Sequence, residues 1–265
     1  MDELRYEPTE KLVSARLGGE RVVATTRAVL VWEPRRVLPS YAVPADELRA
    51  ELMSAPAVHD VPRGDEILHG GFAFGVHSSD GEALDVRAGA ETRVDAAFRS
   101  SDPDLAPYVV LDFHAFDAWY EEDERIVAHP RDPYHRVDIR RGSRHVRVEL
   151  DGTLLAESTR PHLVFETSLA TRFYVPREDV VRPLAATDHH TRCAYKGEAA
   201  FVSLELDGGA RSDLAWTYVR PLPEAAELEG LVAFFDEKAD VIVDGSLQAL
   251  PRTGVAATIV AESEA

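Results

Sequence analysis

Short runs of alternating apolar and polar residues, bounded by turn residues, make up most of the chain. Such alternation predicts strands with one buried and one solvated face. Asp151-Gly152 and Asp244-Gly245 are typical hairpin turns between neighbouring strands. In the second half of the chain the predicted strands are 145–150, 153–158, 162–166, 171–175, 199–206, 213–218, 231–235 and 241–243.

Three segments carry helical patterns instead. Residues 223–230 begin with proline, continue with acidic residues and end at glycine, which is the usual order along a short helix. Residues 45–54 and 105–112 are also predicted to be helical. Strands do not alternate with long helices and no Gly-rich phosphate loop is present, so we expect a mainly β fold of antiparallel sheets.

The chain contains an internal repeat. Residues 25–33 read TTRAVLVWE and residues 158–166 read STRPHLVFE. Four later blocks match in the same order: 41–44 with 174–176 after one deletion, 80–83 with 196–199, 95–98 with 213–216, and 119–122 with 234–237. A period this long exceeds the ~20–50 residues of a solenoid unit, so it predicts duplication of a whole domain.

We therefore expect two tandem duplicated β domains, at 15–128 and 146–250. An Arg- and His-rich connector at 129–145 would join them, and the tail at 251–265 is expected to be loose. The alternative is a pair of unrelated β-rich domains of similar composition.

Composition narrows the class of protein. The 265 residues are 45% apolar and 29% charged, which is typical of a folded globular protein. With 29 Lys and Arg against 47 Asp and Glu, the net charge of −18 argues against nucleic acid as a partner. No apolar run approaches the ~20 residues of a membrane span and the acidic amino terminus is unlike a signal peptide, so we expect a cytoplasmic protein without membrane contact.

Three segments of the second repeat, at 191–199, 213–218 and 230–235, resemble the family known as domain of unknown function 427, which is also labelled nucleotidyltransferase-like. Residues 129–138 resemble the connector of tandem members of that family. The resemblance implies a compact β fold of the β-tent or Mss4-like kind, and it implies no established reaction. Many β-tent relatives bind zinc through paired CxxC motifs, which a chain with one cysteine lacks, and Ala194 stands where family members commonly have proline.

Five side chains of the second repeat are candidate site residues. Cys193 and Tyr195 share one face of an extended segment, as do Trp216 and Tyr218 on a later strand, because side chains alternate along a strand. Lys196 is one of only three lysines. If these strands are neighbours, Tyr195, Lys196, Trp216 and Tyr218 would bind a ligand, and Cys193 or Lys196 would be the catalytic candidate. The alternative is that Cys193 and Trp216 belong to the core and Lys196 to a turn.

The first repeat differs at these positions. In place of Cys193, Tyr195, Lys196, Trp216 and Tyr218 it carries His77, Ser79, Asp80, Phe98 and Ser100. We expect the residues that the two repeats share to maintain the fold, and the residues that differ between them to determine the chemistry of the site. This predicts one working site, in the second domain, with a degenerate counterpart in the first; drift at unimportant surface positions is the alternative.

Glu157, Arg160 and Glu166 form a polar set in the second repeat, and Arg27 and Glu33 repeat two of them. Because the residues occur in both copies, they are interpreted as a structural ion pair. Glu157 and Arg160 are also candidate ligand contacts.

The connector is cationic, with six arginines against two aspartates between residues 131 and 147. Arg131, His135 and Arg136 are candidates for an anion site, because guanidinium groups suit phosphate and carboxylate. The alternative is that the connector pairs with the acidic domains beside it.

No metal site or cofactor is expected. The histidine groups lack the spacing of a zinc site; they are His129 and His135 with Asp138, and His189 and His190 with Asp188. Nucleotidyl transfer needs paired carboxylates beside a phosphate loop, and Asp102-Pro103-Asp104 offers only the pair.

These patterns favour an uncharacterised binding protein whose second domain holds a pocket for a small molecule with an anionic or carbonyl group. One alternative is an enzyme that uses Cys193 or Lys196 on such a ligand. The other is an interaction module without chemistry, whose duplicated surface contacts a protein partner.

Overall fold

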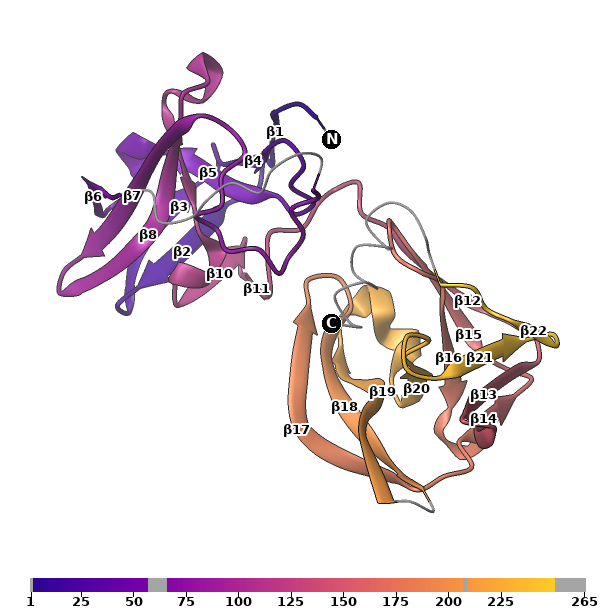
Figure 1. The fold of residues 1–265 in the computed structure, drawn as a ribbon. Helices are drawn as coiled ribbons and strands as arrows, with labels where there is room; N and C mark the ends of the chain where they lie inside the picture. Colours follow the sequence, from indigo (N-terminus) through magenta and orange to yellow (C-terminus); the bar gives the residue numbers. More distant parts are fainter. Residues whose placement is uncertain (1, 57–65, 207–208, 251–265) are drawn as a thin grey trace. The chain divides into compact units, whose positions relative to one another are not determined.

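The computed structural model describes residues 2–56, 66–206 and 209–250. The chain divides into two compact units, Met1–Asp132 and Pro133–Ala265, and each unit contains two antiparallel sheets (Figure 1). The predicted fold class, mainly β with two tandem antiparallel domains, is confirmed.

The first unit pairs a seven-stranded sheet with a four-stranded one. The larger sheet has the order β1 (Arg5–Pro8), β4 (Val29–Trp32), β5 (Ser40–Pro44), β9 (Tyr108–Leu111), β8 (Glu91–Ser100), β7 (Gly81–Ala88) and β6 (Glu51–Ser54). The smaller sheet has the order β11 (Glu124–Ile126), β10 (Ala118–Glu121), β2 (Val13–Leu17) and β3 (Glu20–Thr25). The described residues of the unit also form three 3₁₀ turns: η1 (Ala45–Glu47), η2 (Pro103–Leu105) and η3 (Phe113–Ala115).

The second unit repeats this topology strand for strand. Its larger sheet has the order β12 (Val137–Arg141), β15 (His162–Glu166), β16 (Arg172–Pro176), β20 (Leu231–Phe234), β19 (Gly209–Pro221), β18 (Gly197–Leu206) and β17 (Leu184–Cys193). Its smaller sheet has the order β14 (Thr153–Ser158), β13 (Val146–Leu150), β21 (Asp240–Val243) and β22 (Ser246–Leu247). The 3₁₀ segments are η4 (Arg177–Asp179) and η5 (Pro223–Leu228).

Strand pairing fixes which residues of the two units correspond. Phe98 of β8 faces Val110 of β9, and Trp216 of β19 faces Ala233 of β20, so Phe98 and Trp216 occupy the same place. Ala83 stands opposite Phe98 as Phe201 stands opposite Trp216. The sequence match of 80–83 with 196–199 is therefore wrong by two residues, because bulges in the β7–β8 and β18–β19 pairs shift the register.

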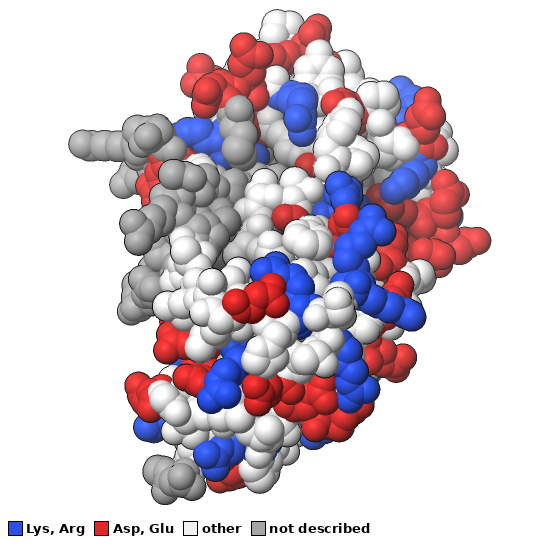
Figure 2. Space-filling model, turned by 90° about the vertical axis from the view of Figure 1, so that its right-hand side faces the viewer, with Lys and Arg blue, Asp and Glu red and all other residues white. Residues whose placement is uncertain are grey.

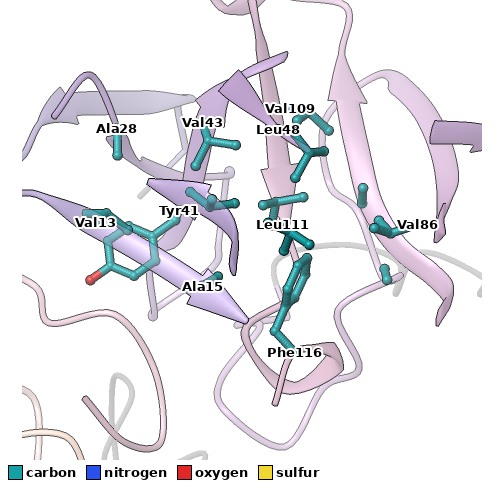
Figure 3. Close-up of a cluster of buried hydrophobic side chains, with 14 of the residues drawn as sticks. Val13, Ala15, Ala28, Tyr41, Val43, Leu48, Val86, Val109, Leu111 and Phe116 are labelled. Carbon is teal, nitrogen blue, oxygen red and sulfur yellow. The ribbon is translucent and has the colours of Figure 1, made fainter. Parts of the chain in front are cut away.

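Each unit buries one face of its larger sheet against its smaller sheet. In the first unit the core includes Val13 and Ala15 of β2 with Tyr41 and Val43 of β5, and Figure 3 shows these side chains together with Phe116. The corresponding core of the second unit packs residues of β13 and β14 against the larger sheet. Alternation along the strands places the remaining side chains of the larger sheet on its opposite face.

That opposite face carries a second, smaller apolar cluster in each unit. In the second unit it contains Tyr174, Trp216 and Tyr218, covered in part by the fully buried Ala225 and Leu228 of η5. The candidate site lies on this face.

Several predicted elements need correction. Residues 45–54 and 105–112 are not helices, because Glu51–Ser54 pairs with β7 and Tyr108–Leu111 pairs with β5, so sheet pairing overrides local helical preference. Only 3₁₀ turns remain near them. The helical segment predicted at 223–230 is present as η5.

The connector prediction also changes. Val137–Arg141 forms β12, which pairs along its whole length with β15 and is therefore part of the second unit. Arg5–Pro8 likewise belongs to the first unit through its pairing with β4. The predicted loose tail at 251–265 lies outside the described residues.

Substitution of Gly197 tests the close backbone approach at the start of β18. Gly197 has φ +99°, and a Cβ there would overlap the carbonyl oxygen of Arg220 and lie 2.8 Å from the amide nitrogen of Leu222. Gly197→Ala is expected to lower the free energy of unfolding by about 3 kcal/mol, because the strain of a positive φ adds to a clash with backbone. Gly245→Ala, at φ +80° in open space, is the control and should cost about 1 kcal/mol. Equal losses in urea unfolding would contradict the close approach.

Candidate functional site

A pocket of about 230 Å³ opens on the second unit's larger sheet, on the face turned away from the smaller sheet. Strands β15 to β19, the turn between β17 and β18, and the segments that follow β15 and β20 supply its walls. The lining residues are Glu166, Leu169, Ala170, Arg172, Tyr174, Thr191, Lys196, Ala199, Phe201, Trp216, Tyr218, Phe235 and Glu237.

Aromatic side chains form most of the apolar wall. Trp216 and Tyr218 lie two residues apart on β19, so both point to the same face of the sheet. Phe201 is the cross-strand neighbour of Trp216, and the ring of Phe235 lies 4.4 Å from that of Trp216. The indole Nε1 of Trp216 donates a hydrogen bond to the hydroxyl of Tyr174 at 3.0 Å. This bond satisfies the indole donor and fixes the position of the ring.

Glu166 is the centre of a buried polar cluster at one side of the pocket. Its side chain is only 5% exposed and forms an ion pair with Lys196. Nε2 of His135 lies 3.0 Å from the other carboxylate oxygen. Burial by itself would raise the pKa of Glu166, but the hydrogen bond from His135 and the charge of Lys196 outweigh it and hold the pKa below its ordinary value.

Arg172 and Glu237 form a second ion pair in the pocket wall. Nη2 of Arg172 donates to Oε1 of Glu237 at 2.5 Å, and Nη1 bonds to Asp236. The guanidinium carbon also lies 5.6 Å from the centre of the Trp216 ring, within cation–π range. Burial lowers the pKa of Arg172, but the two carboxylates more than compensate, so its pKa is raised.

Tyr174 and Tyr218 are neutral hydrogen-bonding groups in this setting. Burial is the main cause that raises the pKa of both phenols, and the charge of Glu166 acts in the same direction. The two phenols therefore take part as hydroxyl groups and not as phenolates.

The sequence of the second unit matches a known protein family. Residues 138–245 match a family described as a domain of unknown function (DUF427). The second unit is a DUF427 domain. The short name of the family refers to nucleotidyl transfer, but that reference is a label only. No curated protein matches the chain.

The DUF427 domain brings together three of the predicted ligand-binding residues: Lys196, Trp216 and Tyr218 line the pocket. Tyr195 does not line it; its ring stacks on His135 at 4.0 Å, and His135 in turn contacts Glu166. Tyr195 is therefore linked to the lining residue Glu166 only through His135.

Cys193 lies next to the pocket without lining it. Cys193 is partly exposed, and in sequence it lies between Thr191 and Lys196, which both line the pocket. Lys196 and Glu166 are among the residues that line the pocket, and Cys193 is not.

Glu157, Arg160 and Glu166 do not form one polar set, so that prediction is wrong. Glu157 contacts His145 at 2.8 Å, on the smaller sheet. Arg160 pairs with Glu178 and Asp179 at 2.8 and 2.9 Å. Sequence proximity misled here, because Arg160 lies in a turn that directs it to η4 while Glu166 points into the pocket face.

The first unit repeats the Arg160 interaction. Arg27 pairs with Asp46 and Glu47 of η1, the counterpart of η4. The arginine thus forms an ion pair in both units, but its partners lie in the 3₁₀ turn that follows the third strand of the larger sheet.

The arginines of the predicted connector already have carboxylate partners. Arg136 and Arg140 both pair with Asp138, and Arg141 pairs with Glu227. Arg131 also has an interaction partner, and His135 is part of the Glu166 cluster. On the face drawn in Figure 2, basic side chains lie beside acidic ones. This arrangement matches paired charges rather than an open anion site.

Several residues that line the pocket were missed from the sequence, among them Arg172, Phe201 and Phe235. The two-residue alternation would have placed Phe201 on one face of its strand, but the cross-strand neighbour that makes it part of the site depends on a bulged register. Arg172 and Phe235 lie at strand ends, where periodicity gives no signal.

Within residues 2–56, 66–206 and 209–250, no cluster of three or more His, Cys, Asp or Glu side chains is arranged to hold a metal ion. The same described residues contain no helix with the length and apolar character needed to cross a membrane.

Replacement of Glu166 by glutamine tests the buried cluster. At neutral pH, Glu166→Gln is expected to lower the free energy of unfolding by about 2–4 kcal/mol, because Lys196 loses its buried counter-charge. The folded pKa lies below the ordinary value of 4.5, so the carboxylate's contribution is complete above that value and is lost as the pH falls through the folded pKa. The difference between wild type and variant in urea unfolding should therefore shrink below pH 4.5.

Glu157→Gln is the control. The Glu157 side chain is 40% exposed, so this substitution should lower the free energy of unfolding by at most about 1 kcal/mol. A wild-type-minus-Glu166→Gln difference that stays constant across the acidic range would show that Glu166 is not a buried paired carboxylate.

Proposed function

We propose that the DUF427 domain binds a small molecule in the pocket on its larger sheet. The observation that carries this proposal is an aromatic-walled pocket of about 230 Å³ with a buried ion pair at each polar side. Mostly apolar clefts with a few fixed polar groups are the usual form of small-molecule sites.

The size and walls of the pocket restrict the ligand. Its volume of about 230 Å³ lies below the ~300–1,000 Å³ of common ligand pockets, which favours a small ligand of one or two rings. Trp216, Phe201 and Phe235 offer flat apolar surfaces, so a planar ligand body would gain contact area and stacking.

The polar groups set how such a ligand would be oriented. Lys196 and Arg172 balance Glu166 and Glu237 in formal charge, so the lining is neutral as a whole. An ammonium has three donors and a guanidinium has five, which leaves N–H groups for a ligand beyond the carboxylate contacts. A carbonyl or anionic group on the ligand would bind there.

Binding is favoured over the predicted catalytic roles of Cys193 and Lys196. An ammonium held in an ion pair has no lone pair for attack on a carbonyl, and Cys193 does not line the pocket. A cytoplasmic location, a β-tent relationship and a protein partner stay predictions from the sequence.

A pocket-filling substitution tests binding. Ala170 lines the pocket from the segment after β15, so Ala170→Phe would occupy the ligand's space with little change to the core. A library of planar metabolites, screened by thermal unfolding, should contain compounds that raise the Tm of wild type by a few degrees and leave Ala170→Phe unchanged.

Ala90→Phe, at an exposed turn of the first unit, is the matched control and should respond like wild type. Hits that stabilise Ala170→Phe as strongly as wild type would overturn the proposal, and so would a library without any hit.

A further inference from the structure

The first unit contains the counterpart of the pocket, and the counterpart is occupied. Glu33 follows β4 as Glu166 ends β15, and Phe98 stands where Trp216 stands. Glu33, like Glu166, is buried, with a side chain 7% exposed. Each unit thus places a buried carboxylate and an aromatic ring on the same face of its larger sheet.

The group between that carboxylate and that ring in the first unit is the imidazole of His77. It stacks on Phe98 with the ring centres 3.7 Å apart and the planes 14° apart. Its Nδ1 lies 3.2 Å from both carboxylate oxygens of Glu33, and its side chain is 10% exposed. The side chain of His77 is therefore a planar nitrogen heterocycle whose ring face contacts Phe98 and whose Nδ1 contacts Glu33.

The long connection between β6 and β7 makes this self-occupation possible. In the second unit, only Ala194, Tyr195 and Lys196 join β17 to β18. In the first unit, residues 55–80 join β6 to β7 and supply His77, with Phe74 packed edge-on against it at 5.0 Å.

The residues around the imidazole are smaller in the first unit, which leaves room for it. By strand pairing, Ala83 stands in place of Phe201, Ala42 in place of Tyr174 and Ser100 in place of Tyr218. The second unit has larger aromatic walls and, at the corresponding position, a pocket lined by both Glu166 and Trp216.

His135 does not take the place of His77 in the second unit. Its ring stacks on Tyr195 and not on Trp216, and it does not line the pocket. Glu166 also has room for a further donor, because a carboxylate offers about four acceptor sites and Lys196 and His135 use one on each oxygen. Glu33, by comparison, accepts from His77 and Ser79 and pairs with Arg36.

We propose, resting on the proposed function, that the ligand of the DUF427 pocket is a small planar nitrogen heterocycle that lies against Trp216 and donates a ring N–H to Glu166. The ligand would do in the second unit what His77 does in the first. Two contacts define the class: a flat ring for the indole and one N–H for the carboxylate. The larger indole face accommodates one ring or two fused rings.

Calorimetric titration of the full chain near neutral pH tests the class with three probes: benzimidazole, 1-methylbenzimidazole and benzoate. Benzimidazole has the ring and the N–H, the methylated compound keeps the ring but lacks the N–H, and benzoate has a ring with a carboxylate instead. We expect benzimidazole to bind wild type and Ala90→Phe but not Ala170→Phe. N-methylation should weaken binding at least about tenfold, because a hydrogen bond to a buried charge is lost.

Equal affinities for benzimidazole and its methylated form would overturn the N–H contact. Binding of benzoate alone, abolished by Ala170→Phe, would overturn the heterocycle class while leaving a functional pocket. If none of the three probes binds wild type, the class is also wrong, and the metabolite screen against Ala170→Phe decides separately whether the pocket binds any ligand.

Discussion

In each unit, a buried carboxylate at the end of the second strand of the larger sheet organises one face of that sheet. Removing a charged carboxylate from water costs several kcal/mol unless cations and hydrogen-bond donors surround it. Glu33 and Glu166 meet this requirement with different partners: His77, Ser79 and Arg36 in the first unit, and Lys196 and His135 in the second. The choice of partners decides whether the space beside the carboxylate is filled or open.

The two faces of the larger sheet differ in what packs against them. One face packs against the smaller sheet and gives the stability of each unit. The other carries a smaller apolar cluster whose surroundings differ between the units: Phe74 of the β6–β7 connection packs on it in the first, and η5 and the pocket adjoin it in the second. The duplicated scaffold thus keeps its core while the second face varies.

The alternation of apolar and polar residues predicted those features that depend on neighbouring residues in the sequence. Alternation located β13 to β16 within a residue or so, and it placed Trp216 and Tyr218 on one face. It missed β17, because an edge strand with the sequence LAATDHHTRC has few apolar residues to alternate. The segments at 45–54 and 105–112 looked helical because the pairing that makes parts of them strands comes from distant residues.

The site was only partly predictable for the same reason. The repeat marked Glu166 as shared, but its partners lie about 30 residues away on either side, so proximity in sequence favoured Arg160 instead. Lys196 and Trp216 stood out by rarity and pattern, whereas Arg172 and Phe235 join them only through the order of strands in the sheet.

Imidazole rescue of a His77→Gly variant tests the central claim most directly, namely that each unit holds a site shaped for a planar ring between a buried carboxylate and an aromatic residue. The account predicts that His77→Gly melts several degrees below wild type and that added imidazole restores much of the loss. Wild type and His114→Gly, which loses an exposed histidine of the same unit, should show no such gain. A His77→Gly variant as stable as wild type, or one that imidazole does not stabilise, would contradict the account.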